Sequence, residues 1–219
     1  MGAYISYRSY KTYNSYNTEM PPNQNNSKLH QIMPTDNSFL PMRGNYRQLI
    51  VYQKAECIYD ITYYFAHHFL EKGDRTIDQM IQAARSGKQN IAEGSAASTT
   101  SRETELKLTN VAKASLQELL IDYEDYLRVN GLELWKTDDS RYKQTRAVAA
   151  KHNDSAYYRE AITQRSDETI ANIAITLIHQ ADSMLVRLIE RLKQEFLQQG
   201  GIKEEMTRAR KNYREKNNL

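Results

Sequence analysis

Apolar residues recur at steps of three and four along several long stretches of the chain, which places them on one face of an α-helix. The first stretch, 46–70, has the inward positions Val51, Ala55, Ile58, Thr62, Phe65 and Phe69. Gly73 and Asp74, which follow this stretch, mark helix ends: Gly73 suits a left-handed helix cap, and Asp74 suits the N-cap of a following helix. The pattern therefore predicts a helix over 46–70 and a second one beginning just after Asp74.

The second predicted helix, 75–97, carries a stripe of mostly small residues. Its inward positions are Ile77, Met80, Ala84, Gly87, Ile91, Gly94 and Ser98. A glycine inside a helix costs roughly 1 kcal/mol relative to alanine. A stripe of small residues also lets a neighbouring helix approach closely, because no side chain holds the backbones apart. We therefore expect tight helix packing along this face.

A third helix is predicted after the polar turn that follows residue 97. Thr100 and Glu103 have the spacing of a capping box at its start, and Asn130–Gly131 ends it after Val129. The expected inward positions are Leu108, Val111, Ser115, Leu119 and Tyr123.

The fourth long helix is predicted to begin near Ser166 and to end at Gly200–Gly201. The stretch 131–165 before it is polar and mixed, with a short helix expected over 141–151 and with Trp135 expected to pack on the body. No strand pattern is visible. The expected fold is all-α: an antiparallel up-and-down four-helix bundle over 44–199, in which 131–165 is a decorated connection between the third and fourth helices.

Residues 1–43 differ from the body in composition. Tyrosine recurs at every third position from Tyr4 to Tyr16, and a polar stretch with almost no aliphatic residues follows. This composition predicts a disordered low-complexity extension, or upstream sequence that is not translated. A tyrosine repeat could also stack on bases. We expect a chain that starts at Met42 to melt at the same temperature as the full chain.

The formal net charge of +3 is unevenly distributed along the chain. Segment 44–202 sums to −2, whereas 203–216 carries six basic residues against three acidic ones. The basic residues are Lys203, Arg208, Arg210, Lys211, Arg214 and Lys216. They predict a basic C-terminal suffix, 200–219, that forms an amphipathic helix and attracts phosphate. A solvated tail is the simpler interpretation of the same charges.

Patterns for metal or catalytic chemistry are weak. None of the five histidines follows a glutamate by three residues, which excludes the di-metal carboxylate bundle. His67 and His68 are adjacent and so point in different directions on a helix, unlike a zinc pair. We therefore expect no metal and no cofactor. Asn90 and Glu93, with Glu118 as a potential neighbour, could form a catalytic pair, although a hydrogen-bond network that fixes helix packing is the simpler interpretation.

The sequence predicts a cytoplasmic protein. No apolar run approaches the length of a membrane span, and the N-terminus has no apolar core of the kind a signal peptide needs. The single cysteine, Cys57, excludes a disulfide within the chain and is most simply a core thiol.

Three strings in the second and third predicted helices resemble the family of four-helix-bundle proteins encoded in intervening sequences of 23S ribosomal RNA. They are Gln79–Ser86 (QMIQAARS), Asn90–Gly94 (NIAEG) and Ala112–Leu119 (AKASLQEL). The likeness covers roughly 46–197, and the segment after Phe196 looks like the suffix of a bacterial subgroup. The motif residues, to which the resemblance gives a structural role, are Asn90, Glu93, Gly94, Ser115 and Glu118.

The resemblance implies a cytosolic bacterial protein that forms a homopentamer of antiparallel bundles and has no known catalytic residues. A relative in that family, the accessory protein of diversity-generating retroelements, forms a basic pentamer that binds nucleic acid and a reverse transcriptase. This chain departs from it in the charge of its bundle.

We therefore expect a non-enzymatic, oligomeric interaction or scaffold protein. Its expected partners are further copies of itself and RNA or DNA, or a protein such as a reverse transcriptase, but not a membrane. The alternative is an enzyme or small-ligand binder with a polar site near Asn90 and Glu93.

Overall fold

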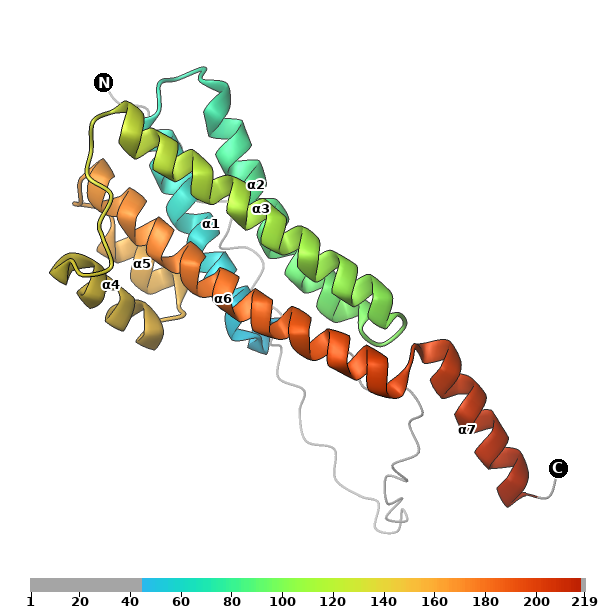
Figure 1. Ribbon diagram of the computed structural model, residues 1–219. Coiled ribbons are helices and arrows are strands. Elements are labelled where there is room, and N and C mark those ends of the chain that lie inside the picture. The colour runs from blue at the N-terminus through green and yellow to red at the C-terminus, as the bar shows by residue number, and fades with distance from the viewer. Residues whose placement is uncertain (1–44, 218–219) are drawn as a thin grey trace, which may run out of the picture. The chain divides into compact units, whose positions relative to one another are not determined.

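The computed structural model of the chain describes residues 45–217 (Figure 1), and the extension predicted over 1–43 lies outside them. The described residues form helices and no strand, which confirms the all-α class. All the helices belong to one unit of the chain, Ser38–Leu219. None of the helices in the described part is long and apolar enough to cross a membrane.

Helix α1, Ile50–Phe69, begins four residues later than the periodicity predicts. The residues before it form a separate 3-10 turn, η2, Tyr46–Gln48, because Leu49 is extended (φ −72°, ψ 119°) and interrupts the helix. After α1, Gly73 adopts a positive φ of 95°. The Asp74 side chain then accepts a hydrogen bond from the Thr76 N–H and caps α2, Arg75–Ala97, as predicted.

Helix α3, Arg102–Val129, is capped by Ser101, and the predicted capping box at Thr100 and Glu103 is wrong. Ser101 is the residue with extended backbone, and its Oγ accepts a hydrogen bond from the Thr104 N–H at 3.1 Å. Thr100 still belongs to the turn that closes α2, because its N–H donates to the Ala97 carbonyl at 2.9 Å.

The inward face of α3 also differs in part from the predicted one. Val111 is 41 % exposed, whereas its neighbour Ala112 is fully buried. Of the other predicted inward residues with a large apolar body, Leu119 and Tyr123 are buried as expected, and Leu108 is half-buried.

Two short helices occupy the predicted connection. Helix α4, Ser140–Lys151, matches the expected short helix, and α5, Ser155–Ala161, was not predicted. Helix α6, Asp167–Gln199, begins after the Ser166 cap, and α7, Ile202–Lys216, follows the glycine break.

Hydrogen bonds at Trp135 and Glu133 hold the start of this connection against α6. Its backbone N–H donates to the Asn172 Oδ1 at 2.8 Å, and the Asn172 amide donates in turn to the Glu133 carbonyl at 2.8 Å. The Trp135 side chain is buried, as the sequence predicts.

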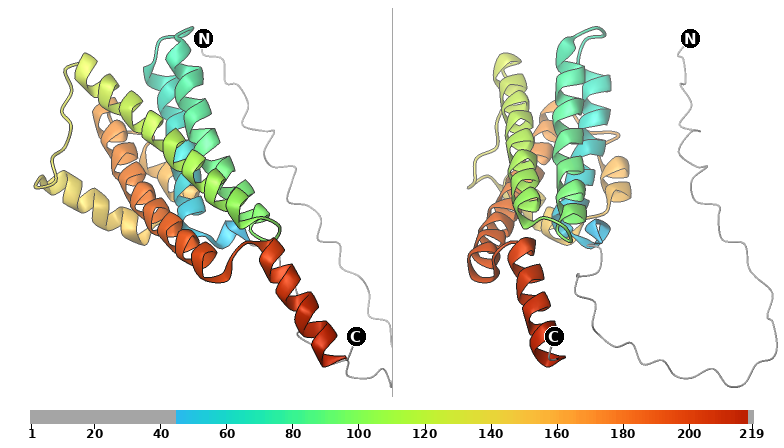
Figure 2. Two further views of the ribbon diagram at one scale, coloured as in Figure 1. Left: turned by 45° about the vertical axis from the view of Figure 1, so that its right-hand side comes forward. Right: turned by 90° about the vertical axis from the view of Figure 1, so that its right-hand side faces the viewer.

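The four long helices α1, α2, α3 and α6 lie side by side in Figures 1 and 2. α2 packs along α3, α3 packs on α6, and α1 packs against both α2 and α6. The short helices cover the outside of this arrangement, α5 against α1 and α4 against α6. The shared core includes Ile58, Phe65, Leu116, Leu119 and Leu177, all fully buried.

The glycine stripe of α2 faces α3. A Cβ atom added to Gly87 would lie 2.7 Å from the Leu116 Cδ2, and one added to Gly94 would lie 3.4 Å from the Glu105 carbonyl oxygen. The small residues therefore serve close packing between two helices of the same chain.

Candidate functional site

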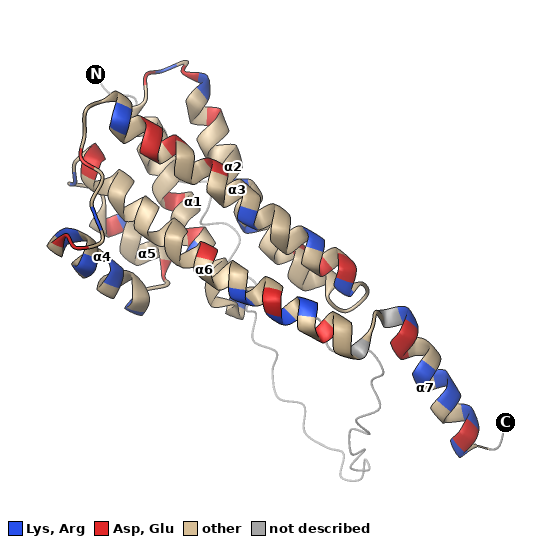
Figure 3. Ribbon diagram, viewed as in Figure 1, with Lys and Arg blue, Asp and Glu red and all other residues tan. Residues whose placement is uncertain are grey.

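The six basic residues predicted to bind phosphate lie on α7, and their side chains are exposed. Figure 3 shows how these cations dominate the helix. Tyr213 among them is 63 % exposed, and Met206 is 52 % exposed. Lys211 and Glu215 approach to 4.0 Å, but both are so exposed that water and salt screen the pair. Lys211 therefore keeps most of its attraction for an anion.

One ion pair ties α7 to the start of α3. The Arg102 Nη2 donates to the Glu205 Oε1 at 2.7 Å, and both side chains are largely buried. Glu105, one turn further along α3, lies in the same charged environment. Burial raises the pKa of its carboxyl to about 6, with a further contribution from Glu195, against the opposing effect of Arg191 and Arg102.

The family-motif residues are split between the α2–α3 seam and the surface. The hydroxyls of Ser86 and Ser115 form a hydrogen bond of 2.9 Å across the seam, and the Asn90 amide donates to the Ser86 carbonyl at 2.9 Å. Glu93 and Glu118 are exposed. Among the described residues, no hydrogen bond or ion pair joins Glu118 to Asn90 or Glu93. Ser86, the centre of the network, was missed as a functional position because serines in helices carry no distinct pattern.

Lys54 is a second polar group that sequence reasoning missed. Its side chain is fully buried, and its Nζ donates to the carbonyls of Ala149 and His152 at the C-terminal end of α4. Burial lowers the pKa of this amine, while nearby Cys57 acts in the opposite direction. The Cys57 thiol is itself buried, and burial raises its pKa to about 12, which leaves it protonated and unreactive.

Helix α4 carries a further basic surface. Lys143, Arg146 and Lys151 are exposed, and the helix contains no acidic residue (Figure 3). Its fourth cation, Arg141, is already paired with Glu133 and Asp139. This surface was missed because the charge of 44–202 was summed over the whole body, where the acidic residues of other helices cancel it. α4 is therefore a second part of the molecule that favours anions.

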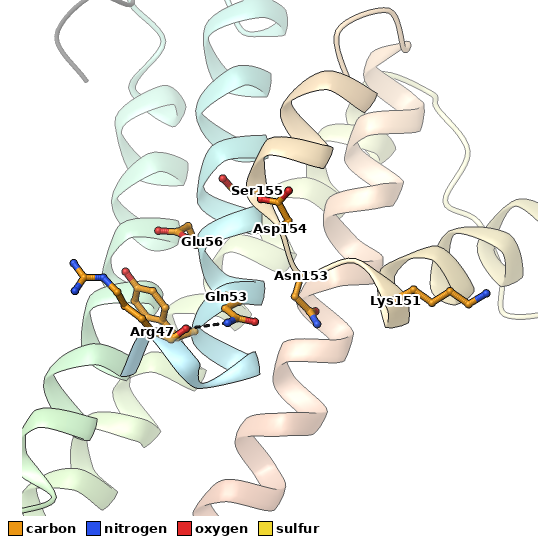
Figure 4. Close-up of a pocket in the computed structure, with 8 residues that line it drawn as sticks. Arg47, Gln53, Glu56, Lys151, Asn153, Asp154 and Ser155 are labelled. Atoms are coloured by element: carbon orange, nitrogen blue, oxygen red, sulfur yellow. Dashed lines mark hydrogen bonds between the residues drawn. The ribbon is translucent and has the colours of Figure 1, made fainter. Parts of the chain in front are cut away.

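Depressions open on the surface of the described residues, and two of them are lined by charged or aromatic side chains. The larger, of about 530 Å³, lies where η2 and the start of α1 meet the segment between α4 and α5. Figure 4 shows Arg47 and Glu56 on one side of it and Lys151 on the other, with Gln53 and Asn153 between them. Its charges are mixed, and its Gln53 amide is already bonded to the Arg47 carbonyl at 2.9 Å. This arrangement favours no particular ligand.

The second depression, of about 230 Å³, lies between α4, α5 and α6 and is lined by aromatic and basic side chains. Trp135 and Tyr158 form part of its wall, and both are buried. No group of three or more His, Cys, Asp or Glu side chains within 45–217 is arranged to hold a metal ion.

No family model matches this chain, and neither the curated proteins nor the solved structures contain a significant match. The likeness to the intervening-sequence family therefore stays a prediction that rests on the three strings in α2 and α3.

Proposed function

We propose that this chain is a non-enzymatic, oligomeric interaction or scaffold protein that binds nucleic acid or a ribonucleoprotein through α7. The observation that carries the proposal is the exposure of all six α7 cations. Lysine and arginine side chains that neutralise phosphates release condensed counterions, which drives binding without reading the sequence.

The proposed architecture is an antiparallel up-and-down four-helix bundle. Its support is that α1, α2, α3 and α6 each pack against two of the others, in the order of a closed ring. The connections from α1 to α2 and from α2 to α3 are only a few residues long, which favours antiparallel neighbours.

A homopentamer would multiply the charge of α7. One copy of 203–216 carries a net +3, so five copies in a ring would present about +15 together. The basic surface of α4 would add to this field. The number of subunits comes from the family resemblance, as do the bacterial cytoplasmic location and a retroelement-accessory-like role with a reverse transcriptase as partner.

An exposed apolar face on α3 supports self-association. Val111 and Ile121 are 41 % and 56 % exposed, and Ala114 lies between them on the same face at steps of three and seven residues. Contiguous exposed apolar side chains of this kind often mark a protein–protein contact. Glu118, also on this face, would sit at the edge of such a contact or pair with a cation across it.

The non-enzymatic part of the proposal is supported by the polar groups of the α2–α3 seam. The Asn90 amide and the hydroxyls of Ser86 and Ser115 bond to one another, so their hydrogen-bonding capacity is largely used in holding two helices together.

A binding titration with single-stranded RNA and DNA at low and moderate salt tests the proposal. The full chain should bind weakly and lose affinity as salt rises, and a chain ending at Gly200 should lose most of the binding. A variant with Arg210→Gln, Lys211→Gln and Arg214→Gln should reduce the salt slope by about two units, since each phosphate contact on a single strand contributes about 0.7.

A variant with Lys72→Gln, Arg75→Gln and Arg85→Gln is the matched control, because it removes the same number of exposed charges from the region of α2, outside both α7 and α4. Binding that survives truncation at Gly200, or that is insensitive to salt, would remove α7 from the mechanism. Absence of binding by the full chain would leave a protein–protein assembly module.

A further inference from the structure

The depression between α4, α5 and α6 is large enough to hold one flat ring and has walls suited to it. Its volume is about 230 Å³, whereas a cavity of roughly 150 Å³ is enough to hold benzene. Aromatic, apolar and basic side chains line it, and no acidic one does. The lining residues used below are Trp135, Arg141, Val148, Tyr157, Tyr158 and Arg165.

Trp135, one of the lining residues of this pocket, carries an unsatisfied donor. The residue is only 8 % exposed, and its indole Nε1–H has no acceptor among the described residues. A buried tryptophan N–H normally has a partner, because losing water without gaining an acceptor is unfavourable. A bound molecule with a hydrogen-bond acceptor on a flat ring would supply one.

The neighbouring tyrosines offer the packing surface that a flat ring requires. Tyr157 is 36 % exposed and stacks on His152, with ring centroids 4.0 Å apart and planes 12° apart. Tyr158 is buried and meets Tyr157 edge-on at 5.2 Å. Aromatic side chains held rigidly in this way stack on nucleobases of any sequence, since every base has a π-face.

The two arginines of the pocket have different roles. Arg141 lies 5.1 Å from the centre of the Trp135 ring and is already paired with Asp139 at 2.6 Å and with Glu133 at 2.7 Å, so it has little charge left for a ligand. Arg165 is exposed, and its Nε donates to the Ala161 carbonyl at 2.9 Å. Within 45–217 no carboxylate forms an ion pair with Arg165, which leaves its terminal N–H groups for an anion.

From these contacts we infer that the α4–α5–α6 pocket binds a nucleotide. The base lies among Trp135, Tyr157 and Tyr158 and accepts a hydrogen bond from the Trp135 Nε1, and the phosphate lies at Arg165. The nucleotide can be free or part of a single strand. In the second case the inference rests on the proposed function above, and in the first it stands alone.

Trp135 is the single tryptophan of the chain, so its fluorescence reports on this pocket directly. Adenosine monophosphate should change the emission of the full-length protein in a saturable way, and calorimetry should give the same dissociation constant. Adenosine should bind more weakly, and inorganic phosphate alone should leave the emission unchanged. No saturable response to the nucleotide or to a short oligoadenylate would overturn the inference.

Arg165→Gln should weaken the binding of adenosine monophosphate about tenfold, as expected for a hydrogen bond to a charged group, and should leave adenosine unaffected. Arg187→Gln is the matched control, because Arg187 is exposed on α6 and its Nε makes the same kind of bond to a carbonyl one turn back, at 3.2 Å. Equal effects of the two variants would contradict the phosphate position.

Val148→Phe gives an independent check, because it fills the pocket without changing the charge. It should weaken the binding of the nucleotide and of the nucleoside alike, and unchanged binding of both would place the ligand elsewhere.

A pentanucleotide distinguishes the two sources of the ligand. If it binds at least tenfold more tightly than the mononucleotide, the pocket takes one unit of a strand; equal affinity identifies a free nucleotide. Repeating the titration with a chain ending at Gly200 separates this pocket from α7, since the pocket does not include that helix.

Discussion

Gly87 shows how a single hydrogen atom sets the distance between two helices. A Cβ atom at this position would lie 2.7 Å from the Leu116 Cδ2 and 2.9 Å from its Cγ, and Leu116 is fully buried. Gly87→Ala gains about 1 kcal/mol of helix propensity, but overpacking of this kind costs about 1–3 kcal/mol. We expect a net loss in the free energy of unfolding, measured by chemical denaturation, and a larger loss for Gly87→Leu.

A double variant provides the control for Gly87. In a background of Leu116→Ala the obstructing atoms are absent, so Gly87→Ala should become neutral or stabilising, and the two substitutions should show a favourable coupling. If Gly87→Ala alone stabilises the protein, the α2–α3 contact is looser than described.

Glu105 makes the stability of the protein depend on pH between 4.5 and about 6. Its folded pKa of about 6 lies above the ordinary value of 4.5, so the fold favours the protonated carboxyl. The protonated carboxyl therefore stabilises the fold below the ordinary pKa, and this stabilisation is lost as pH rises through about 6. The shift corresponds to about 2 kcal/mol, which solvent screening of this partly exposed group reduces to about 1 kcal/mol.

Glu105→Gln should therefore stabilise the protein at pH 7 by up to about 1 kcal/mol and should have little effect below the ordinary carboxyl pKa. Thermal melting of both proteins across this pH range measures the difference. Glu103→Gln is the control, because Glu103 is exposed in the same helix turn. A constant difference between Glu105→Gln and the parent at all pH values would contradict the assignment.

At the scale of elements, Lys54 explains how the short helix α4 is held. Its amine donates to two carbonyls at the end of α4, where the helix dipole also favours a positive charge. Lys54→Met keeps the length of the side chain but removes the donor to the Ala149 carbonyl, while the His152 carbonyl keeps only the Tyr158 hydroxyl at 3.3 Å. We expect a loss of about 1–3 kcal/mol in the free energy of unfolding.

Hydrogen exchange gives the more specific test of the Lys54 bonds. Amides of α4 should exchange faster in Lys54→Met, while those of α2 and α3 should change only with global stability. Lys72→Met serves as control, because Lys72 is exposed in the turn between α1 and α2. A Lys54→Met protein that is more stable, with unchanged protection of α4, would show that the burial of the charge outweighs the bonds it makes.

At the scale of the whole molecule, the proposal requires self-association. Light scattering should give a homopentamer at micromolar concentration. Ile121→Lys, on the exposed apolar face of α3, should lower the mass, because it places a charge in a contact that excludes water. Val186→Lys is the matched control: Val186 is 48 % exposed but belongs to α6 and so is not part of that face of α3. A monomer at micromolar concentration would contradict the oligomer proposal.

The sequence by itself determined the helical class and most helix ends. Periodicity of three and four residues is a local property, and Gly73, Asp74 and Ser166 act on the backbone within a few residues of themselves. The same locality explains two errors. Thr100 and Ser101 are both good caps, and only the backbone of the turn selects Ser101. Helix α5, with seven residues, is too short to show a period.

The tertiary structure decided which polar groups meet. Lys54 became a buried anchor because the end of α4, which lies 95 residues further along the chain, returns to α1. The aromatic pocket likewise forms only where α4, α5 and α6 come together, so no single stretch of sequence predicts it. Of the motif residues, Asn90 and Ser115 joined in one network through Ser86, whereas Glu93 and Glu118 face solvent. Sequence spacing fixes which face of a helix a residue occupies, but the partner across that face is fixed only when the helices pack.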